Sequence, residues 1–163
     1  MKKIKRLFLI VTFVVLLDQV TKHIITKLFY LHQSIEVIPG FLNIVYVRNP
    51  GAAFGILREA NAFLGIPILT IVALIAVVVL FYLYIVEESG FSYGMIGLPL
   101  IMAGTIGNLI DRIRMGEVVD FIDIYIKFYH WPAFNVADMS ITTGACILLF
   151  TLVSRPLSSQ SVQ

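Results

Sequence analysis

The run from 62 to 86 contains no charged side chain, and it constrains the fold of this chain more than any other feature. A helix rises about 1.5 Å per residue, so a run of this length can cross the roughly 30 Å of hydrocarbon in a bilayer. Composition agrees, because 59% of the residues are hydrophobic, 13% are charged and the mean hydropathy is +0.93. These values lie outside the range of soluble globular proteins. The chain is therefore predicted to be an integral membrane protein.

Three further apolar runs predict a bundle of four spans, at about 7–28, 91–110 and 135–154 in addition to 62–86. The first run follows a basic cluster, as a cleavable signal peptide would, but no small-x-small cleavage site ends it, so it is expected to be retained. We expect one membrane domain over residues 1–163, an all-α polytopic protein with four transmembrane helices.

The two long connections, about 30–61 and 111–134, each lie between an odd and an even span and therefore share one side of the membrane. The segments 34–38 and 41–47 are rich in Ile and Val around a Pro-Gly turn, and 118–126 is also strand-like. A small extracytoplasmic β element is expected on that side.

The distribution of basic residues predicts the orientation. Lys2, Lys3, Lys5 and Arg6 lie directly beside the first span, whereas the Lys and Arg residues at the other side are more numerous but dispersed. We give more weight to the first cluster, because the first span usually sets the topology and positive charge stays inside. Both termini are therefore expected in the cytoplasm and both long loops outside.

Polar residues far apart in sequence then arrive at the outer edge of the membrane. Asn49 and Asp120 come from the loops, Asn108 from the end of the third span and Asp138 from the start of the fourth. Three residues of this region have simple explanations. Asp120 can be a solvated loop acid, Asn135 can cap the N-terminus of the fourth helix, and Asp138 can interact favourably with the positive end of that helix. However, two carboxyl groups at one depth among apolar residues cannot both ionise cheaply. Their pairing favours a functional site.

Two pairs of residues at helical spacing also have two interpretations. Asp18 lies just past the middle of the first span and can form an ion pair with Lys22, whose side chain can extend outward to water. Alternatively, the group Asp18, Gln19 and Lys22 faces the bundle interior and orients a polar site. Asn108 and Arg112 share a helix face and either anchor the span at the interface or support a site.

Small residues mark two places where backbones can approach closely. Asn49-Pro50-Gly51 is a common turn, and the small residues that follow it would also admit a substrate backbone. Gly104 and Gly107 permit close packing of the third span on a neighbour.

Five short motifs occur in a fixed order along the chain. They are Asp-Gln-x-x-Lys from Asp18, Asn-x-Gly-Ala-Ala-Phe from Asn49, Gly-Asn-x-x-Asp-Arg from Gly107, Val-Val-Asp-Phe from Val118 and Phe-Asn-x-Ala-Asp from Phe134. Each is weak alone, but the ordered set resembles the lipoprotein signal peptidase family, also called signal peptidase II. The chain departs from the family at Ala103, where a second glycine is common, which affects packing rather than chemistry.

The resemblance implies a membrane aspartic endopeptidase that removes the signal peptide from diacylglyceryl-modified bacterial prolipoproteins, just before the lipidated cysteine. Asp120 and Asp138 are then the catalytic pair. Six residues are assigned to support or substrate binding: Asp18, Asn49, Gly51, Asn108, Arg112 and Asn135. The expected location is the bacterial cytoplasmic (inner) membrane, with several passes and the active site toward the extracytoplasmic side. The expected partners of this monomer are lipidated prolipoproteins and membrane lipids.

Other chemistries fit the sequence less well. No metal or other cofactor is expected, because His23, His32 and His130 lack the spacing of a helical ligand pair. Cys146 lies well inside the fourth span, which argues against a cysteine nucleophile. A dispersed net charge of +2 predicts no nucleic-acid partner.

Two rival functions remain at this point. A proton-coupled transporter would use intramembrane aspartates as a relay and would need polar residues on both sides of the membrane. A non-catalytic assembly subunit would leave the two aspartates without a role.

Overall fold

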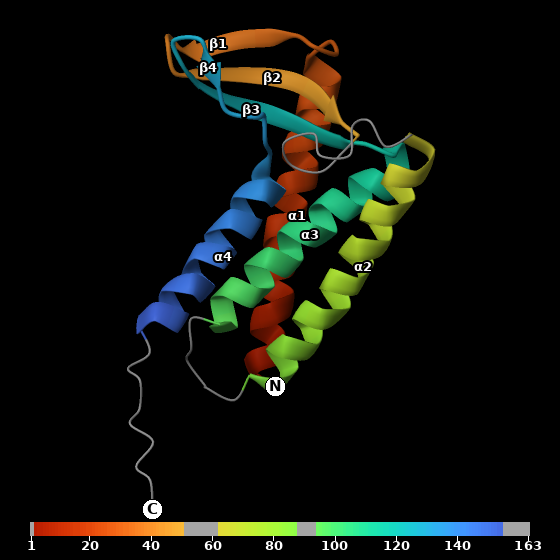
Figure 1. Cartoon of the computed structure of the whole chain (residues 1–163), viewed down its shortest axis with the longest axis vertical. Coiled ribbons are helices and arrows are strands. Elements are labelled where there is room, and N and C mark those ends of the chain that lie inside the picture. Colours follow the sequence, from red (N-terminus) through yellow and green to blue (C-terminus); the bar gives the residue numbers. More distant parts are fainter. Residues whose placement is uncertain (1, 51–61, 88–93, 155–163) are drawn as a thin grey trace, which may run out of the picture.

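The computed structural model describes residues 2–50, 62–87 and 94–154, which form a helical bundle with a small antiparallel sheet at one end (Figure 1). The elements follow in the order α1 (Lys2–Leu28), β1 (Ser34–Ile38), β2 (Leu42–Asn49), α2 (Ala62–Val86), α3 (Gly94–Met115), β3 (Val118–Ile126), β4 (Tyr129–His130) and α4 (Val136–Ser154). The protein is thus mostly helical, as predicted, with a small β element.

Three helices in the described part of the chain are long and apolar enough to cross a membrane: Lys2–Leu28, Pro67–Val86 and Gly94–Met115. The apolar part of α4, Val136–Thr151, is shorter. α3 is the central helix, since it packs on α1, α2 and α4. α2 instead leaves most of its apolar side chains on the surface, as a lipid-facing helix does.

The third predicted span ends at about 110, whereas α3 continues to Met115. Basic side chains in the last turn of a helix interact favourably with the negative end of its dipole, so Arg112 and Arg114 stabilise this extension. Gly116 then ends the helix with a left-handed φ of 74°, and its N–H donates to the Arg112 carbonyl at 3.0 Å. The start of the predicted span, residues 91–93, lies outside the described residues.

The three predicted strands, with the short β4 that was not predicted, form one sheet in the order β1-β2-β3-β4. The hairpin of β1 and β2 turns at Gly40, whose φ of 74° suits glycine. β2 then pairs antiparallel with β3, which places Val47 opposite Asp120 and Asn49 opposite Val118. The two long connections therefore meet at the same end of the bundle, as their positions between odd and even helices predicted (Figure 1).

Two apolar clusters hold these layers together. One lies among the helices and contains Leu7, Tyr84 and Met102. The other joins α1 to the sheet through Ile25, Tyr46, Val119 and Phe121. The second cluster fixes the sheet on the end of the bundle, and the polar residues singled out from the sequence lie beside it.

Candidate active site

Asp120 and Asp138 reach one site from two different elements. Asp120 lies on β3 and is only 3% exposed, whereas Asp138 is partly buried in the first turn of α4. Both line a cavity of about 630 Å³ together with Asn49, Asn108 and Arg112. The rest of the wall is mainly apolar and includes Trp131, Pro132, Phe134, Met139 and Ile141. A small polar patch therefore faces an apolar cavity, which is the usual composition of a ligand site.

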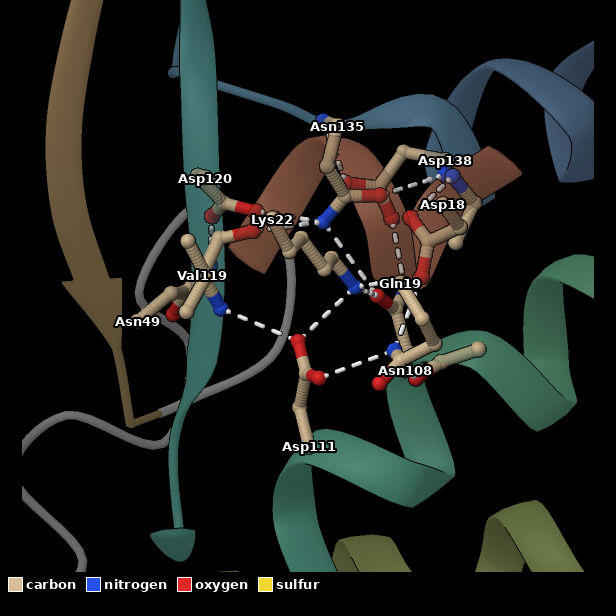
Figure 2. A network of polar contacts seen from close by, with 12 residues as sticks. Asp18, Gln19, Lys22, Asn49, Asn108, Asp111, Val119, Asp120, Asn135 and Asp138 are labelled. Carbon is tan, nitrogen blue, oxygen red and sulfur yellow. Dashed lines mark hydrogen bonds and ion pairs between the residues drawn. The ribbon is translucent and has the colours of Figure 1, made fainter. Parts of the chain in front are cut away.

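Every carboxylate oxygen of this pair accepts one hydrogen bond from an N–H group (Figure 2). Asn135 Nδ2 donates to Oδ1 of Asp120 at 2.7 Å, and Asn49 Nδ2 donates to Oδ2 at 3.1 Å. Asn108 Nδ2 donates to Oδ1 of Asp138 at 2.8 Å, and the Asn135 backbone N–H donates to Oδ2 at 3.2 Å. Four donors thus fix the orientation of both carboxyl groups.

Asn135 also caps α4, so the simple explanation of this residue is correct as well. Its Oδ1 accepts from the Asp138 N–H at 2.9 Å, while its own N–H donates to the Asp138 side chain. This reciprocal pattern is a capping box. The same side chain bonds Asp120 through Nδ2, so the start of α4 and the position of β3 are coupled through one fully buried residue.

The environment of Asp120 disfavours its charged form. Burial, and secondly the charge of Asp138, raise the pKa of Asp120 to about 7, although hydrogen bonds from Asn49 and Asn135 and the charge of Lys22 act in the opposite direction. Asp120 can therefore hold a proton near neutral pH. The sequence-based alternative, a solvated loop acid, is wrong because this side chain is buried.

A second polar layer lies behind the pair and consists of Asp18, Lys22 and Asp111 (Figure 2). Lys22 Nζ lies 2.9 Å from Asp18 Oδ2 and 2.8 Å from Asp111 Oδ2, and it also donates to Asn108 Oδ1 at 3.0 Å. The expectation that Lys22 extends outward to water is wrong, since the residue is 3% exposed. The ion pair of Asp18 and Lys22 predicted from their spacing is present.

This second layer is joined to the backbone on three elements. Asp18 Oδ1 accepts the Ala137 N–H at 2.9 Å, and Asp111 Oδ2 accepts the Val119 N–H at 3.2 Å. Gln19 Nε2 donates to Asp111 Oδ1 at 3.0 Å and to the Gly107 carbonyl at 3.2 Å. In the described part of the chain, no buried side-chain nitrogen or oxygen is without a hydrogen-bond partner.

Small residues allow the helices to approach closely enough for these contacts. A Cβ added at Gly107 would lie 2.6 Å from Asp18 Oδ2, and one added at Gly104 would overlap the Ala137 carbonyl oxygen. The predicted packing role of both glycines is confirmed. Ala103, the departure from the family pattern, is fully buried.

Comparison with known proteins agrees with this architecture. Residues 10–154 match the model of the family described as signal peptidase (SPase) II. The chain belongs to the signal peptidase II family. The lipoprotein signal peptidase of Syntrophus aciditrophicus (strain SB) is 48% identical over 157 residues, which cover 95% of this chain and 97% of that protein. The lipoprotein signal peptidase of Staphylococcus aureus (strain JH9) is 46% identical over 145 residues, or 89% of this chain and 86% of that protein.

Two solved structures of bacterial membrane enzymes have a similar fold. A bacterial membrane enzyme determined by the in meso method at 2.3 Å resolution superimposes with a TM-score of 0.85 at 39% identity, covering 96% of this chain and 93% of the other. A second bacterial membrane enzyme, determined at 1.9 Å, has a TM-score of 0.80 at 41% identity, covering 92% and 94%. With its apolar helices, this member of the signal peptidase II family is a membrane protein.

The structure brings most of the residues assigned from the sequence into one region. This set comprises Asp18, Asn49, Asn108, Arg112, Asp120, Asn135 and Asp138, while Gly51 lies outside the described residues. The six supporting residues did not include Lys22, Gln19 or Asp111, although the alternative in which Asp18, Gln19 and Lys22 orient a polar site agrees with the contacts of Gln19 and Lys22. A signal for Asp111 was present, because it lies three residues after Asn108 and therefore on a neighbouring part of the same helix surface.

Proposed function

We propose that this chain is a membrane aspartic endopeptidase that cleaves the signal peptide from diacylglyceryl-modified bacterial prolipoproteins, just before the lipidated cysteine. Membership of the family supports the substrate class. The observation that carries the aspartic mechanism is the pair of carboxyl groups, Asp120 and Asp138, facing one cavity with an N–H donor on each oxygen. No metal ion takes part in this proposal.

Hydrolysis would proceed through a water molecule held between the two side chains. The ionised carboxylate removes a proton from the water, whose oxygen attacks the scissile carbonyl carbon, while the protonated carboxyl group hydrogen-bonds the developing oxyanion. The tetrahedral intermediate then collapses: the C–N bond breaks, and a proton passes from a carboxyl group to the departing amine. Both carboxyl groups finish the cycle with one shared proton between them.

We assign the proton in the resting enzyme to Asp120 and the base to Asp138. The raised pKa of Asp120, about 7, supports the first assignment. The position of Asp138 in the first turn of α4 supports the second, because the positive end of a helix favours a negative charge. The Arg112 side chain, which lines the same cavity, would bind a carbonyl oxygen of the substrate.

The membrane arrangement we propose has four spans, with both termini in the cytoplasm and the site at the extracytoplasmic side. Support comes from the basic residues at the start of α1, which favour a cytoplasmic N-terminus. α4 would be the fourth span although its apolar part is short, since 136–151 covers about 24 Å as a helix. A substrate could then keep its acyl chains in the bilayer while its peptide enters the cavity. Because one chain supplies both carboxyl groups, a monomer would be sufficient for the reaction.

A proton-coupled transporter is less well supported. Within the described ranges, the buried charged residues are Asp18, Lys22, Asp111, Asp120 and Asp123. Asp120 and Asp123 lie on β3, and the other three form one cluster that reaches the Val119 N–H of the same strand through Asp111, so all five lie at the sheet end of the bundle. A relay across the membrane would require buried ionisable groups toward the opposite end as well.

The test is cleavage of a lipidated prolipoprotein by the purified protein and by its Asp120→Asn and Asp138→Asn variants. Each variant should lose at least about a thousandfold in kcat, because residues that act as one catalytic unit are each indispensable. The pH profile of the wild type should fall as pH rises through about 7, where Asp120 loses its proton. Full activity in either variant would disprove the assignment of the pair.

Asp123→Asn is the matched control, since this acid lies on the same strand as Asp120 but bonds Asn43 and His130 instead of lining the cavity. It should retain activity within about threefold of the wild type, as expected for changes away from the reacting groups. Asp111→Asn is not a suitable control, because Asp111 is 2% exposed and paired with Lys22.

A further inference from the structure

Three buried ionisable side chains take no part in the proposed reaction, although they lie directly behind the site. Asp18, Lys22 and Asp111 have side chains that are 0%, 4% and 2% exposed. Burying charges is expensive even when they are paired, and well-packed apolar residues would serve stability as well or better. Charge balance inside this group therefore does not explain why the chain places a lysine here.

The contacts of Lys22 outside its ion pairs supply a reason. Its ammonium group has donors and no acceptor, so any side-chain amide that touches it must present its oxygen. Asn108 does so, with Oδ1 lying 3.0 Å from Lys22 Nζ. The Nδ2 group of Asn108 must then point the other way, and it donates to Asp138 at 2.8 Å.

The same constraint extends to Asn135. Its Nδ2 donates to Asn108 Oδ1 at 3.2 Å as well as to Asp120 Oδ1 at 2.7 Å, which leaves Oδ1 of Asn135 to accept the N–H of Asp138. If the Asn108 amide were reversed, its NH₂ group would face the donors of both Lys22 and Asn135, and an oxygen would face Asp138. A donor-only group on α1 thus sets the direction of the Asn108 amide, whose oxygen also accepts from Asn135, the donor to Asp120 (Figure 2).

We infer that Lys22 is a positioning residue: its buried ammonium group fixes the amide orientation of Asn108, so that Asn108 aims an N–H donor at the proposed catalytic Asp138 and an acceptor at Asn135, the donor to Asp120. This inference rests on the proposed function. Without Lys22, only Asn135 holds the Asn108 oxygen, and Asn135 must also serve Asp120 and the Val119 carbonyl.

A charge effect has to be separated from this positioning effect. The charged groups that face Asp120 are Asp138 on α4, Lys22 on α1 and Arg112 on α3, and removal of Lys22 alone would raise the pKa of Asp120 further. The double variant Lys22→Met/Asp111→Asn removes one charge of each sign, so it restores the balance of charge while the donor toward Asn108 stays absent. It is also safer for folding than Lys22→Met alone, since it leaves one buried carboxylate, Asp18, without its cation instead of two.

The experiment measures kcat, KM and the pH profile for cleavage of one lipidated prolipoprotein by the wild type, Lys22→Met and the double variant. In Lys22→Met, kcat should fall by about 10- to 100-fold, as for other groups that orient a reacting residue. The limb of the pH profile at high pH, where activity falls, should move to higher pH. In the double variant, the limb should return toward its wild-type position, while kcat stays reduced by at least about tenfold and KM changes by less than about threefold.

Recovery of wild-type kcat in the double variant would overturn the inference, because Lys22 would then only balance the charge of Asp111. A rise in KM with unchanged kcat would overturn it too, since that result indicates weaker substrate binding. If the wild type itself fails to cleave the prolipoprotein, the proposed function fails, and this outcome is distinct from failure of the positioning role.

Discussion

The protein contains two polar clusters built from similar groups, one enclosed at the end of the helical bundle and one on the sheet. The enclosed cluster joins Asp18, Lys22 and Asp111 with side chains that are at most 4% exposed. The sheet cluster pairs Asp123 with His130 at 2.9 Å, but the His130 side chain is 52% exposed. A second part of the sheet cluster joins Tyr125 to Glu36 and stacks the Tyr125 ring on His130 at 4.9 Å.

The comparison shows that identical contact distances do not mean identical contributions. The pair on the sheet is expected to contribute between about 0 and 1 kcal/mol, since His130 is half exposed and Asp123 keeps a hydrogen bond from Asn43 when the pair breaks. In the enclosed cluster the loss of one partner leaves an uncompensated buried charge, which costs about 3–5 kcal/mol. The enclosed cluster is consequently rigid, and rigidity is what the orientation of the two amides requires.

The largest effect on stability is expected for Lys22→Met, which should lower the free energy of unfolding by about 3–5 kcal/mol. The reason is that Asp18 and Asp111 both lose their cationic partner. Denaturant or thermal unfolding in detergent micelles measures this change. Lys27→Met, an exposed change on the same helix, is the control and should stay within about 0.5 kcal/mol of the wild type. Equal losses of stability in Lys22→Met and Lys27→Met would contradict a special contribution of the enclosed cluster.

Asp120→Asn should stabilise the protein at alkaline pH. The pKa of Asp120 rises from the ordinary value of 3.8 to about 7 in the fold, so the folded state binds a proton that the unfolded state has lost. The wild-type free energy of unfolding should therefore decrease as pH rises from about 4 to about 7, by up to about 4 kcal/mol.

The asparagine variant lacks this pH dependence, although the loss of one hydrogen bond offsets about 1 kcal/mol of the gain. Melting temperatures measured on both sides of this pH range test the prediction. Asp123→Asn on the sheet serves as the comparison and should show no such gain at high pH. A variant at Asp120 that is less stable than the wild type at every pH would contradict the account of the buried carboxyl group.

Substitution of two glycines by alanine compares the space available in the two regions. Gly107→Ala should cost about 1–3 kcal/mol, because the new Cβ would lie 2.6 Å from Asp18 Oδ2 in a region that cannot relax. Gly40→Ala has open space around it and should cost only about 1–2 kcal/mol, owing to its left-handed φ of 74°. Activity separates the two cases: Gly107→Ala should also lower kcat, whereas an equal loss in Gly40→Ala would show that the sheet turn controls the site.

The smallest effect is expected for His130→Gln. The substitution removes the contact of a half-exposed imidazole with Asp123 and the stacking on Tyr125, and Asp123 keeps its hydrogen bond from Asn43, so it should cost less than about 1 kcal/mol. Thermal unfolding and the prolipoprotein assay both measure it. A loss as large as that of Lys22→Met would mean that the sheet cluster is structurally essential.

Much of the fold could be predicted because its signals are local. The uncharged run 62–86 gave the bounds of α2, and the Ile-rich segment 34–38 gave those of β1. The end of α3 could not be predicted from charge, since Asp111 and Arg112 look like a boundary until the partners that bury Asp111 are known. Lys22 was left out of the six supporting residues for the same reason: whether a lysine reaches water or turns inward depends on Asn108 and Asp111, which come from a helix far along the chain.

The dependence of α4 on earlier elements has a consequence for biosynthesis. Asn135 and Asp138 hold their positions only through contacts with α1, α3 and β3, and these contacts are the last to become available because α4 is the final helix. A nascent chain that ends just after β3 already contains Asp120 and its donor Asn49, but it lacks Asn135 and the second carboxyl group, Asp138. With the proposed catalytic pair, we expect proteolytic activity to begin only when α4 docks, so that a product without α4 should be inactive.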